Sequence, residues 1–454
     1  MLVRRAIADL AGKSWRRGRA VRLISNSDMK SDVPYPAHPP IPTPAQANAT
    51  SNSDPDYSLD TLLAMAGCHQ SDPLTGAVTP PLHFSTTFER DENLTLSRGF
   101  NYSRIGNPTR KLFEDAMAAI ERGSSAHAFA SGMQAAMSVF ISFPHAHVMV
   151  SDDNYHGVVV LLTDVFSKWG VTFEKVDMTN HNAVKERLDA FHKDSAASHR
   201  PLLFWMETPT NPKCKVVDIA KLSKLVKSTI GEENSFVVVD ATWSTPYLVR
   251  PLTLGADCVL HSGTKYIGGH SDCMGGVLVL GSSPAVSKVS PMLHTVHHDG
   301  GGVLSPFDSW LLLRGLRTLP VRMKAHCTNA MAVAEYLQGH KAIKKVYYPG
   351  LLIHPQHKLA SEMMGEMYGG MLSFTVKAED SKLEETAMKV VKHVKLFKKA
   401  TSLGGTESLI EHRASVEGKY GATPKNLLRV SVGLEDIGDL IADLDSALEA
   451  ATGK

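Results

Sequence analysis

Between residue 112 and about residue 300, helical segments alternate with short, fully apolar strand segments. The clearest strands are HAHVMV (145–150), SFVVVD (235–240) and ADCVLHS (256–262). Continuous apolar runs of this length are typical of strands that are buried on both faces, and their alternation with helices predicts a mostly parallel sheet wrapped by helices. We therefore expect an α/β fold in which residues 112–310 form a large domain.

A different pattern follows from about residue 305. A long helical segment over 305–340 is expected to be interrupted near Pro320, because proline disrupts a helix interior. Strand and helix patterns then mix, and the chain ends in an amphipathic helix over 435–451. Residues 311–454 are accordingly predicted to form a smaller α+β domain.

The first 57 residues differ in kind from the rest. Residues 1–27 carry seven basic side chains and one acid, and their apolar residues share one helical face, which is typical of an organellar transit peptide. A Pro-, Ser- and Asn-rich linker follows, too polar to form a core. Localisation is therefore expected to be mitochondrial or plastid if this segment is a transit peptide, and cytoplasmic if it is only a disordered tail with chance arginines.

Composition narrows the class of protein. The chain has 454 residues, is 43% hydrophobic and 21% charged, and carries a net charge of +2 without a sustained basic stripe, which argues against nucleic-acid binding. No stretch reaches membrane-spanning length, and the five cysteines form no CxxC pair. The histidines of HPQH (354–357) and HTVHH (294–298) lack an accompanying acid or Cys set, so we expect no metal site.

Lys265 stands out because it follows the predicted buried strand 256–262 closely, directly behind the hydroxyls of Ser262 and Thr264. Desolvation there would lower the pKa of the amine and favour its neutral, nucleophilic form, which a lysine needs to form a Schiff base. Ser262 and Thr264 are spaced to bind a phosphate beside it, and paired glycines follow. The alternative is a strand end followed by an ordinary turn.

Asp240 ends another buried strand, 235–240. A carboxylate at the carboxyl end of a parallel strand points into the crevice where such sheets bind ligands. An ionised aspartate there can keep a pyridine nitrogen protonated, so that the ring accepts electrons from a substrate carbanion. A helix cap or an Asx-turn is the alternative.

Three further segments offer ligand-binding groups. Ser131, Gly132 and Met133 are expected at a helix N-terminus, which favours an anion, although an ordinary Ser cap is possible. Tyr155 follows a strand end, where its ring can stack on a pyridine. Arg429 lies within an apolar strand pattern and needs a partner, either a substrate carboxylate or an internal salt bridge.

Taken in order, these segments resemble the Cys/Met-metabolism pyridoxal-phosphate enzymes, the family of cystathionine γ-synthase, cystathionine γ-lyase, cystathionine β-lyase and methionine γ-lyase. The resemblance covers roughly residues 58–450. It implies the fold type I architecture of aspartate aminotransferase-like enzymes, with pyridoxal 5'-phosphate (PLP) as cofactor. It rests on TGAVTPPLHFSTTF (75–88), NYSRIGNPTR (101–110), FASGMQAA (129–136), ETPTNP (207–212), VVVDATWSTP (237–246), HSGTKYIGGHSD (261–272), SLGGTESL (402–409) and NLLRVSVGLED (426–436).

The resemblance also implies roles for individual residues. Lys265 would hold the cofactor as a Schiff base and act as acid and base, with Tyr155 as partner in protonating the leaving group. Residues 58–111 would form an arm that contacts a neighbouring subunit of a homotetramer, with Tyr102 and Arg104 reaching the partner's phosphate. The other implied cofactor contacts are Ser131, Gly132, Met133, Tyr155, Asn211, Asp240, Thr242, Ser262 and Thr264, and the substrate contacts are Ser402 and Arg429.

The chain departs from the family pattern where specificity is usually set. Thr401 occupies the position before SLGG where cystathionine γ-enzymes commonly carry Glu, and Arg413 replaces the proline of the usual His-Pro-Ala. His156 stands where Gly often follows the stacking tyrosine. We predict a transsulfuration enzyme of the cystathionine γ-synthase/γ-lyase type acting on a sulfur amino acid. Methionine γ-lyase, cystathionine β-lyase and homoserine-ester sulfhydrylase are the near alternatives, and an inactive binding protein is the alternative of another class.

Overall fold

The computed structural model describes residues 57–194, 199–418 and 423–453. The predicted transit segment and linker therefore lie outside the described residues, apart from Tyr57. No helix in the described part of the chain is long and apolar enough to span a lipid bilayer.

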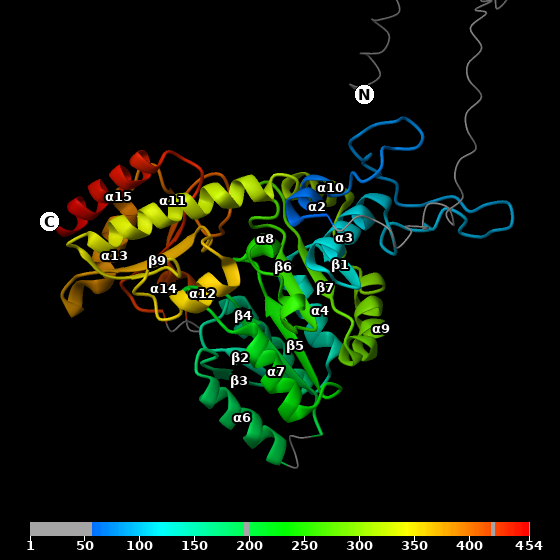
Figure 1. The fold of residues 1–454 in the computed structure, drawn as a ribbon, viewed down its shortest axis with the longest axis horizontal. Coiled ribbons are helices and arrows are strands. Elements are labelled where there is room, and N and C mark those ends of the chain that lie inside the picture. The colour runs from blue at the N-terminus through cyan, green and yellow to red at the C-terminus, as the bar shows by residue number, and fades with distance from the viewer. Residues whose placement is uncertain (1–56, 195–198, 419–422, 454) are drawn as a thin grey trace, which may run out of the picture. The chain divides into compact units, whose positions relative to one another are not determined.

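A seven-stranded sheet forms the centre of the first half of the fold (Figure 1). Its order is β1-β7-β6-β5-β4-β2-β3, with parallel pairing from β6 through β3 and antiparallel pairing of β7 with both neighbours. The mostly parallel sheet predicted from the sequence is confirmed. The strands are β1 (Ser125–Phe129), β2 (His147–Ser151), β3 (Thr172–Val176), β4 (Leu202–Glu207), β5 (Ser235–Asp240), β6 (Cys258–Ser262) and β7 (Gly276–Leu280).

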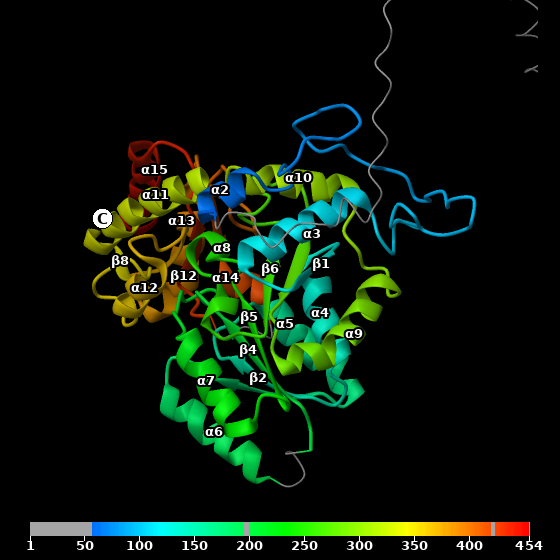
Figure 2. The same ribbon diagram turned by 45° about the vertical axis from the view of Figure 1, so that its right-hand side comes forward.

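Helices cover both faces of this sheet, which is why its central strands β4 and β5 are buried along their whole length (Figure 2). Val237 and Val239 of β5 pack into one core cluster with α3, α6 and α7, whereas Phe236 and Val238 pack into a second cluster with α4, α5 and α9. The helices of this half are α2 (Leu59–Ala64), α3 (Pro108–Glu121), α4 (Gly132–Ser142), α5 (His156–Val160), α6 (His181–Lys193), α7 (Ile219–Ile230), α8 (Thr245–Leu248) and α9 (Pro284–His298).

The long helical segment after residue 305 is two helices, α10 (Pro306–Leu316) and α11 (Leu319–Gly339). Pro320 lies in the first turn of α11, where its missing N–H costs no hydrogen bond. The predicted interruption is thus a helix boundary. Helix α11 contacts α2 and α8 near its start and β8, β9 and α15 farther on, so it links the two sheets.

The second sheet has five strands in the order β10-β11-β12-β9-β8, antiparallel except for β10 with β11. Helices α11, α13 and α15 contribute to its core. The elements are β8 (Ile343–Tyr347), α12 (His357–Met364), β9 (Met371–Val376), α13 (Leu383–His393), β10 (Lys398–Lys399), β11 (Leu409–His412), α14 (Arg413–Glu417), β12 (Leu427–Ser431) and α15 (Ile437–Thr452).

Candidate active site

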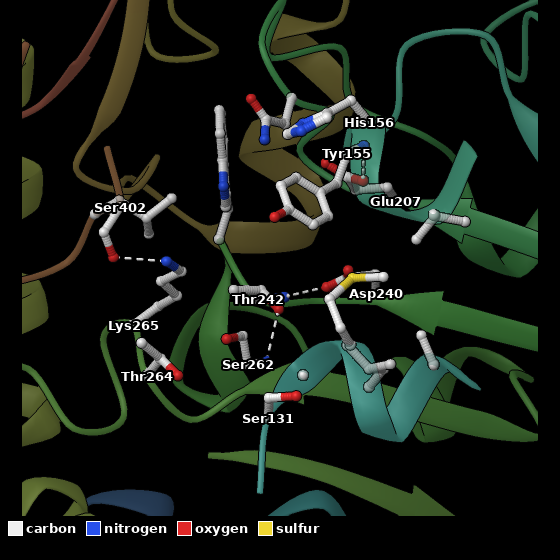
Figure 3. A pocket seen from close by; sticks show the side chains of 18 of the residues that line it. Ser131, Tyr155, His156, Glu207, Asp240, Thr242, Ser262, Thr264, Lys265 and Ser402 are labelled. Atoms are coloured by element: carbon white, nitrogen blue, oxygen red, sulfur yellow. Dashed lines mark hydrogen bonds between the residues drawn. The ribbon is translucent and has the colours of Figure 1, made fainter. Parts of the chain in front are cut away.

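One pocket gathers the carboxyl ends of the central strands, the start of α4 and residues of the second sheet. Figure 3 shows Lys265 reaching toward Ser402 on one side, with Tyr155 and Asp240 on the other. Every site residue predicted from the sequence lines this pocket, except Tyr102 and Arg104. Those that line it are Ser131, Gly132, Met133, Tyr155, Asn211, Asp240, Thr242, Ser262, Thr264, Lys265, Ser402 and Arg429.

Lys265 lies in the turn that follows β6, with its backbone N–H bonded to the Ser262 carbonyl at 3.2 Å. Its ammonium donates to Ser402 Oγ at 2.6 Å. Burial, with a contribution from the positive charge of Arg429, lowers the pKa of Lys265 to about 8. A substantial fraction of this amine is therefore neutral near physiological pH, as the buried strand end suggested.

Asp240 is the last residue of β5 and is buried. Its Oδ1 accepts a hydrogen bond from the Thr242 N–H at 3.0 Å, and Thr242 Oγ1 accepts one from the Ser262 N–H at 2.9 Å. This chain of contacts ties the ends of β5 and β6 together. Burial raises the pKa of Asp240, so the carboxylate would gain from an opposite charge in the pocket.

The N-terminus of α4 forms another wall of the pocket. Ser131 is the N-cap, and its hydroxyl accepts from the Gln134 N–H at 3.0 Å, so the ordinary cap is present, and the anion site stays a prediction. The amides of Gly132 and Met133 begin the helix and have no acceptor within it. A side chain at Gly276 would meet the Ser131 carbonyl oxygen at 2.4 Å, so glycine there lets this helix end lie against β7.

Tyr155 precedes α5, and its backbone N–H donates to Glu207 Oε2 at 2.7 Å. Glu207 ends β4 and lies opposite Asp240 in the sheet register. Burial and the neighbouring Asp240 raise the pKa of Glu207 well above its usual range, which favours the neutral acid. Burial also raises the pKa of Tyr155, so its hydroxyl keeps its proton.

Arg429 of β12 is buried and has several partners in the pocket wall. It donates to Asn211 Oδ1 at 3.2 Å and to the Ser402 carbonyl at 3.1 Å, and it forms an ion pair with Glu411. The sequence left open whether Arg429 pairs with substrate or with an internal acid, and Glu411 supplies the internal acid. Ser402 has φ of +88°, a conformation that costs a non-glycine residue about 1–3 kcal/mol, and is held through both its hydroxyl and its carbonyl.

Tyr102 and Arg104 lie on the arm, away from the pocket lining. Arg104 donates to the His298 carbonyl at 2.7 Å and lies 3.5 Å from Asp299. Both Tyr102 and Arg104 are about 40% exposed. In one chain they therefore do not complete the pocket.

Several pocket residues received no role from the sequence. Glu207 could have been found by the rule that found Asp240, since it also ends a buried parallel strand. Trp243, and Glu411 behind the lining residue Arg429, carried no comparable signal. Thr401, Arg413 and His156, where the chain departs from its relatives' pattern, also line the pocket.

Among the residues that the structure describes, no group of three or more His, Cys, Asp or Glu side chains is arranged to hold a metal ion. His354 of HPQH and His297 of HTVHH are buried and bonded to nearby groups.

The pocket groups fit a cofactor with an anionic end and a basic ring nitrogen. The free amides of α4, with the Ser262 and Thr264 hydroxyls, suit a phosphate, and Asp240 suits a protonated ring nitrogen. Lys265, whose lowered pKa leaves part of its amine neutral, lines the same pocket. Fold and pocket together indicate the class: an α/β enzyme whose pocket suits a phosphorylated ring cofactor beside a lysine.

Comparisons with known proteins agree with this class. The family model for Cys/Met metabolism PLP-dependent enzymes matches residues 60–449. The chain is 41% identical to cystathionine beta-lyase of Coxiella burnetii, over 88% of this chain and 100% of that protein. It is 42% identical to cystathionine gamma-synthase of Mycobacterium leprae, over 84% of this chain and 94% of that protein. The structure of cystathionine gamma synthase from Xanthomonas oryzae pv. oryzae in complex with aminoacrylate and cysteine matches with a TM-score of 0.79 and 34% identity, over 88% of this chain and 100% of that one.

The chain belongs to the Cys/Met metabolism PLP-dependent enzyme family, and its fold is the fold type I architecture of PLP-dependent enzymes. The resemblance drawn from the sequence motifs is confirmed. Its cofactor is accordingly pyridoxal 5'-phosphate.

Proposed function

We propose that the chain is a transsulfuration enzyme of the cystathionine γ-synthase/γ-lyase type, in which Lys265 holds the cofactor and moves protons on the substrate. The observation that carries the proposal is the placement of Lys265, half-buried and with its pKa lowered to about 8, in one pocket with Asp240, the α4 N-terminus and Arg429. The relatives named cystathionine gamma-synthase and cystathionine beta-lyase support the substrate class.

Each side chain has a defined task in this proposal. Asp240, with Thr242, would hold the ring nitrogen, and Asn211 would bond the ring hydroxyl. Tyr155 would cover one ring face. The amides of Gly132 and Met133, at the start of the helix capped by Ser131, would hold the phosphate together with the Ser262 and Thr264 hydroxyls. Arg429 binds the substrate carboxylate beside Ser402.

When bound, PLP supplies a carbonyl that condenses with amines and a ring that accepts negative charge from the substrate. Lys265 Nζ accepts the proton from the substrate α carbon, because its lowered pKa makes it a base near neutral pH. Once Nζ has released that proton, the neutral amine accepts a second proton from the β carbon, which allows a γ substituent to depart. The Tyr155 hydroxyl keeps its proton and can donate it to the departing group.

Product analysis separates this proposal from its neighbours. The purified enzyme is expected to give 2-oxobutyrate and cysteine from cystathionine, or cystathionine from an activated homoserine ester with cysteine. Pyruvate with homocysteine as the main products from cystathionine would instead assign a β-lyase, and rapid turnover of methionine a methionine γ-lyase. Thr401 lines the pocket at the position where a Glu would pair with a distal ammonium, so the preferred substrate need not carry one.

We also propose that two copies of the chain build each active site. The side chains of Tyr102 and Arg104 are each about 40% exposed, and the same arm exposes large apolar side chains. A second copy of the chain packed on the arm would remove these apolar side chains from water. Arg104 of the partner subunit would then reach the cofactor phosphate, since a guanidinium suits that group. The exposed apolar residues of the arm are Leu74, Val78, Phe84, Leu94 and Leu96.

Complementation tests this shared site. Lys265→Ala and Arg104→Ala chains should each be inactive or strongly impaired as homo-oligomers. When they are co-expressed in equal amounts, half of the sites in mixed dimers should be intact, so about a quarter of wild-type activity is expected to return. A mixture no more active than the sum of the separate variants would place Arg104 in the site of its own chain.

A further inference from the structure

Arg413 is a second buried arginine in the pocket wall, at the start of α14. It is 1% exposed, and its polar contacts are all long. Its Nη2 lies 3.2 Å from Glu417 Oε1 and 3.4 Å from His156 Nδ1, and its Nη1 lies 3.4 Å from both Glu411 oxygens. Contacts of this length to a buried guanidinium can shorten, so that a partner carboxylate can form a closer hydrogen bond with Arg413.

Glu411 is shared between the two arginines. Its Oε2 lies 2.5 Å from Arg429 Nη2, much closer than either of its oxygens lies to Arg413. Glu411 belongs to β11 and stands opposite Arg429 of β12 in the antiparallel register. A substrate carboxylate that binds Arg429 must therefore compete with Glu411 for the same guanidinium.

The charges explain why this competition needs a second cation. Glu411 is 6% exposed and cannot turn to water when Arg429 takes another carboxylate. An unpaired buried carboxylate is costly, so it needs another cation within reach. Arg413 is that cation, although Glu417, itself bonded to Thr423 at 2.6 Å, offsets part of its charge.

We propose that Arg413 is a positioning residue that holds Glu411 while Arg429 takes the carboxylate of the substrate. The proposal rests on the role of Arg429 proposed above. Arg413 then acts on carboxylate binding through Glu411, and Glu417 opposes it. Replacing Arg413 and replacing Glu417, the two members of one ion pair, should consequently change the affinity for the same ligand in opposite directions. If the pair were only structural, both replacements would change that affinity in the same direction.

Equilibrium binding to the cofactor-loaded enzyme tests this without turnover. The probes are 4-methylthiobutanoate, which has no amino group to react, and its neutral amide, both measured by calorimetry. We expect Arg413→Met to weaken binding of the acid by about tenfold and Glu417→Gln to tighten it severalfold, because each changes the local charge by one unit in opposite directions. Arg413→Lys should recover part of the affinity, and the amide should respond little to any of the variants.

The outcomes separate the two proposals. The midpoint temperature of thermal unfolding should fall for both Arg413→Met and Glu417→Gln, since each breaks a buried ion pair. The affinity for the acid, in contrast, should change in opposite directions in the two variants. If both variants weaken acid and amide alike, the pair is structural and the role of Arg413 is overturned. If the wild-type enzyme binds acid and amide equally, the role of Arg429 fails instead.

Discussion

Replacing Lys265 with alanine is expected to lower turnover on the order of 10⁴-fold or more, the largest effect of any single change in this protein. The reason is that the Lys265 amine has two roles in the proposal: it holds the cofactor, and it transfers protons at two substrate carbons. Its burial lowers its pKa to about 8, so no exposed lysine can substitute for it. Steady-state assay of the purified variant with the substrate that the product analysis identifies measures the loss.

Lys358→Ala provides a matched control, because that side chain is 92% exposed and remote from the pocket lining. Its activity should equal that of the wild type. Circular dichroism should show both variants folded, since removing a buried ammonium leaves no unpaired charge behind. Retention by Lys265→Ala of more than about one hundredth of wild-type turnover would mean that another group does the proton transfer.

Replacing Asp240 with asparagine is expected to lower turnover by about 10²- to 10³-fold. Asparagine keeps the size of the side chain and an acceptor for the Thr242 N–H, but it removes the negative charge that would keep the ring nitrogen protonated. The loss should therefore appear in kcat more than in cofactor affinity. Turnover and cofactor titration on the same preparation separate the two.

Glu207→Gln is the matched control for Asp240, because Glu207 ends the neighbouring strand in the same register. Its carboxyl favours the neutral form and its contact is to the Tyr155 backbone, so the amide should cost less than about tenfold. Equal losses for the two variants would contradict the assignment of the ring nitrogen to Asp240. The negative charge beside the ring nitrogen would then be shared by Asp240 and Glu207.

The sequence predicted the central sheet and most of the pocket because the relevant strands are buried on both faces. The middle residues of these strands are apolar, so the polar residues Asp240 and Ser262 mark where β5 and β6 end. The N-terminus of α4 was predictable for a similar local reason, since Ser131 caps the helix that begins at Gly132.

The rest of the site depends on contacts that local pattern does not encode. Arg413 meets His156 although 257 positions separate them, and only the packing of the second sheet against the first brings them together. The pairing of Glu411 with Arg429 depends on the register of β11 and β12, which their apolar patterns leave open. Glu207, in contrast, ends a buried parallel strand as Asp240 does, so local pattern is sufficient to identify it.

Borohydride reduction of the cofactor-loaded enzyme, followed by peptide mass spectrometry, tests the central claim most directly. Lys265 is the lysine that lines the pocket, and its neutral amine is the group expected to bond the cofactor. We expect a single pyridoxyl adduct, on the peptide that contains Lys265, and no adduct on the corresponding peptide of Lys265→Ala. An adduct on another lysine, or no adduct on a protein that turns over substrate, would contradict it.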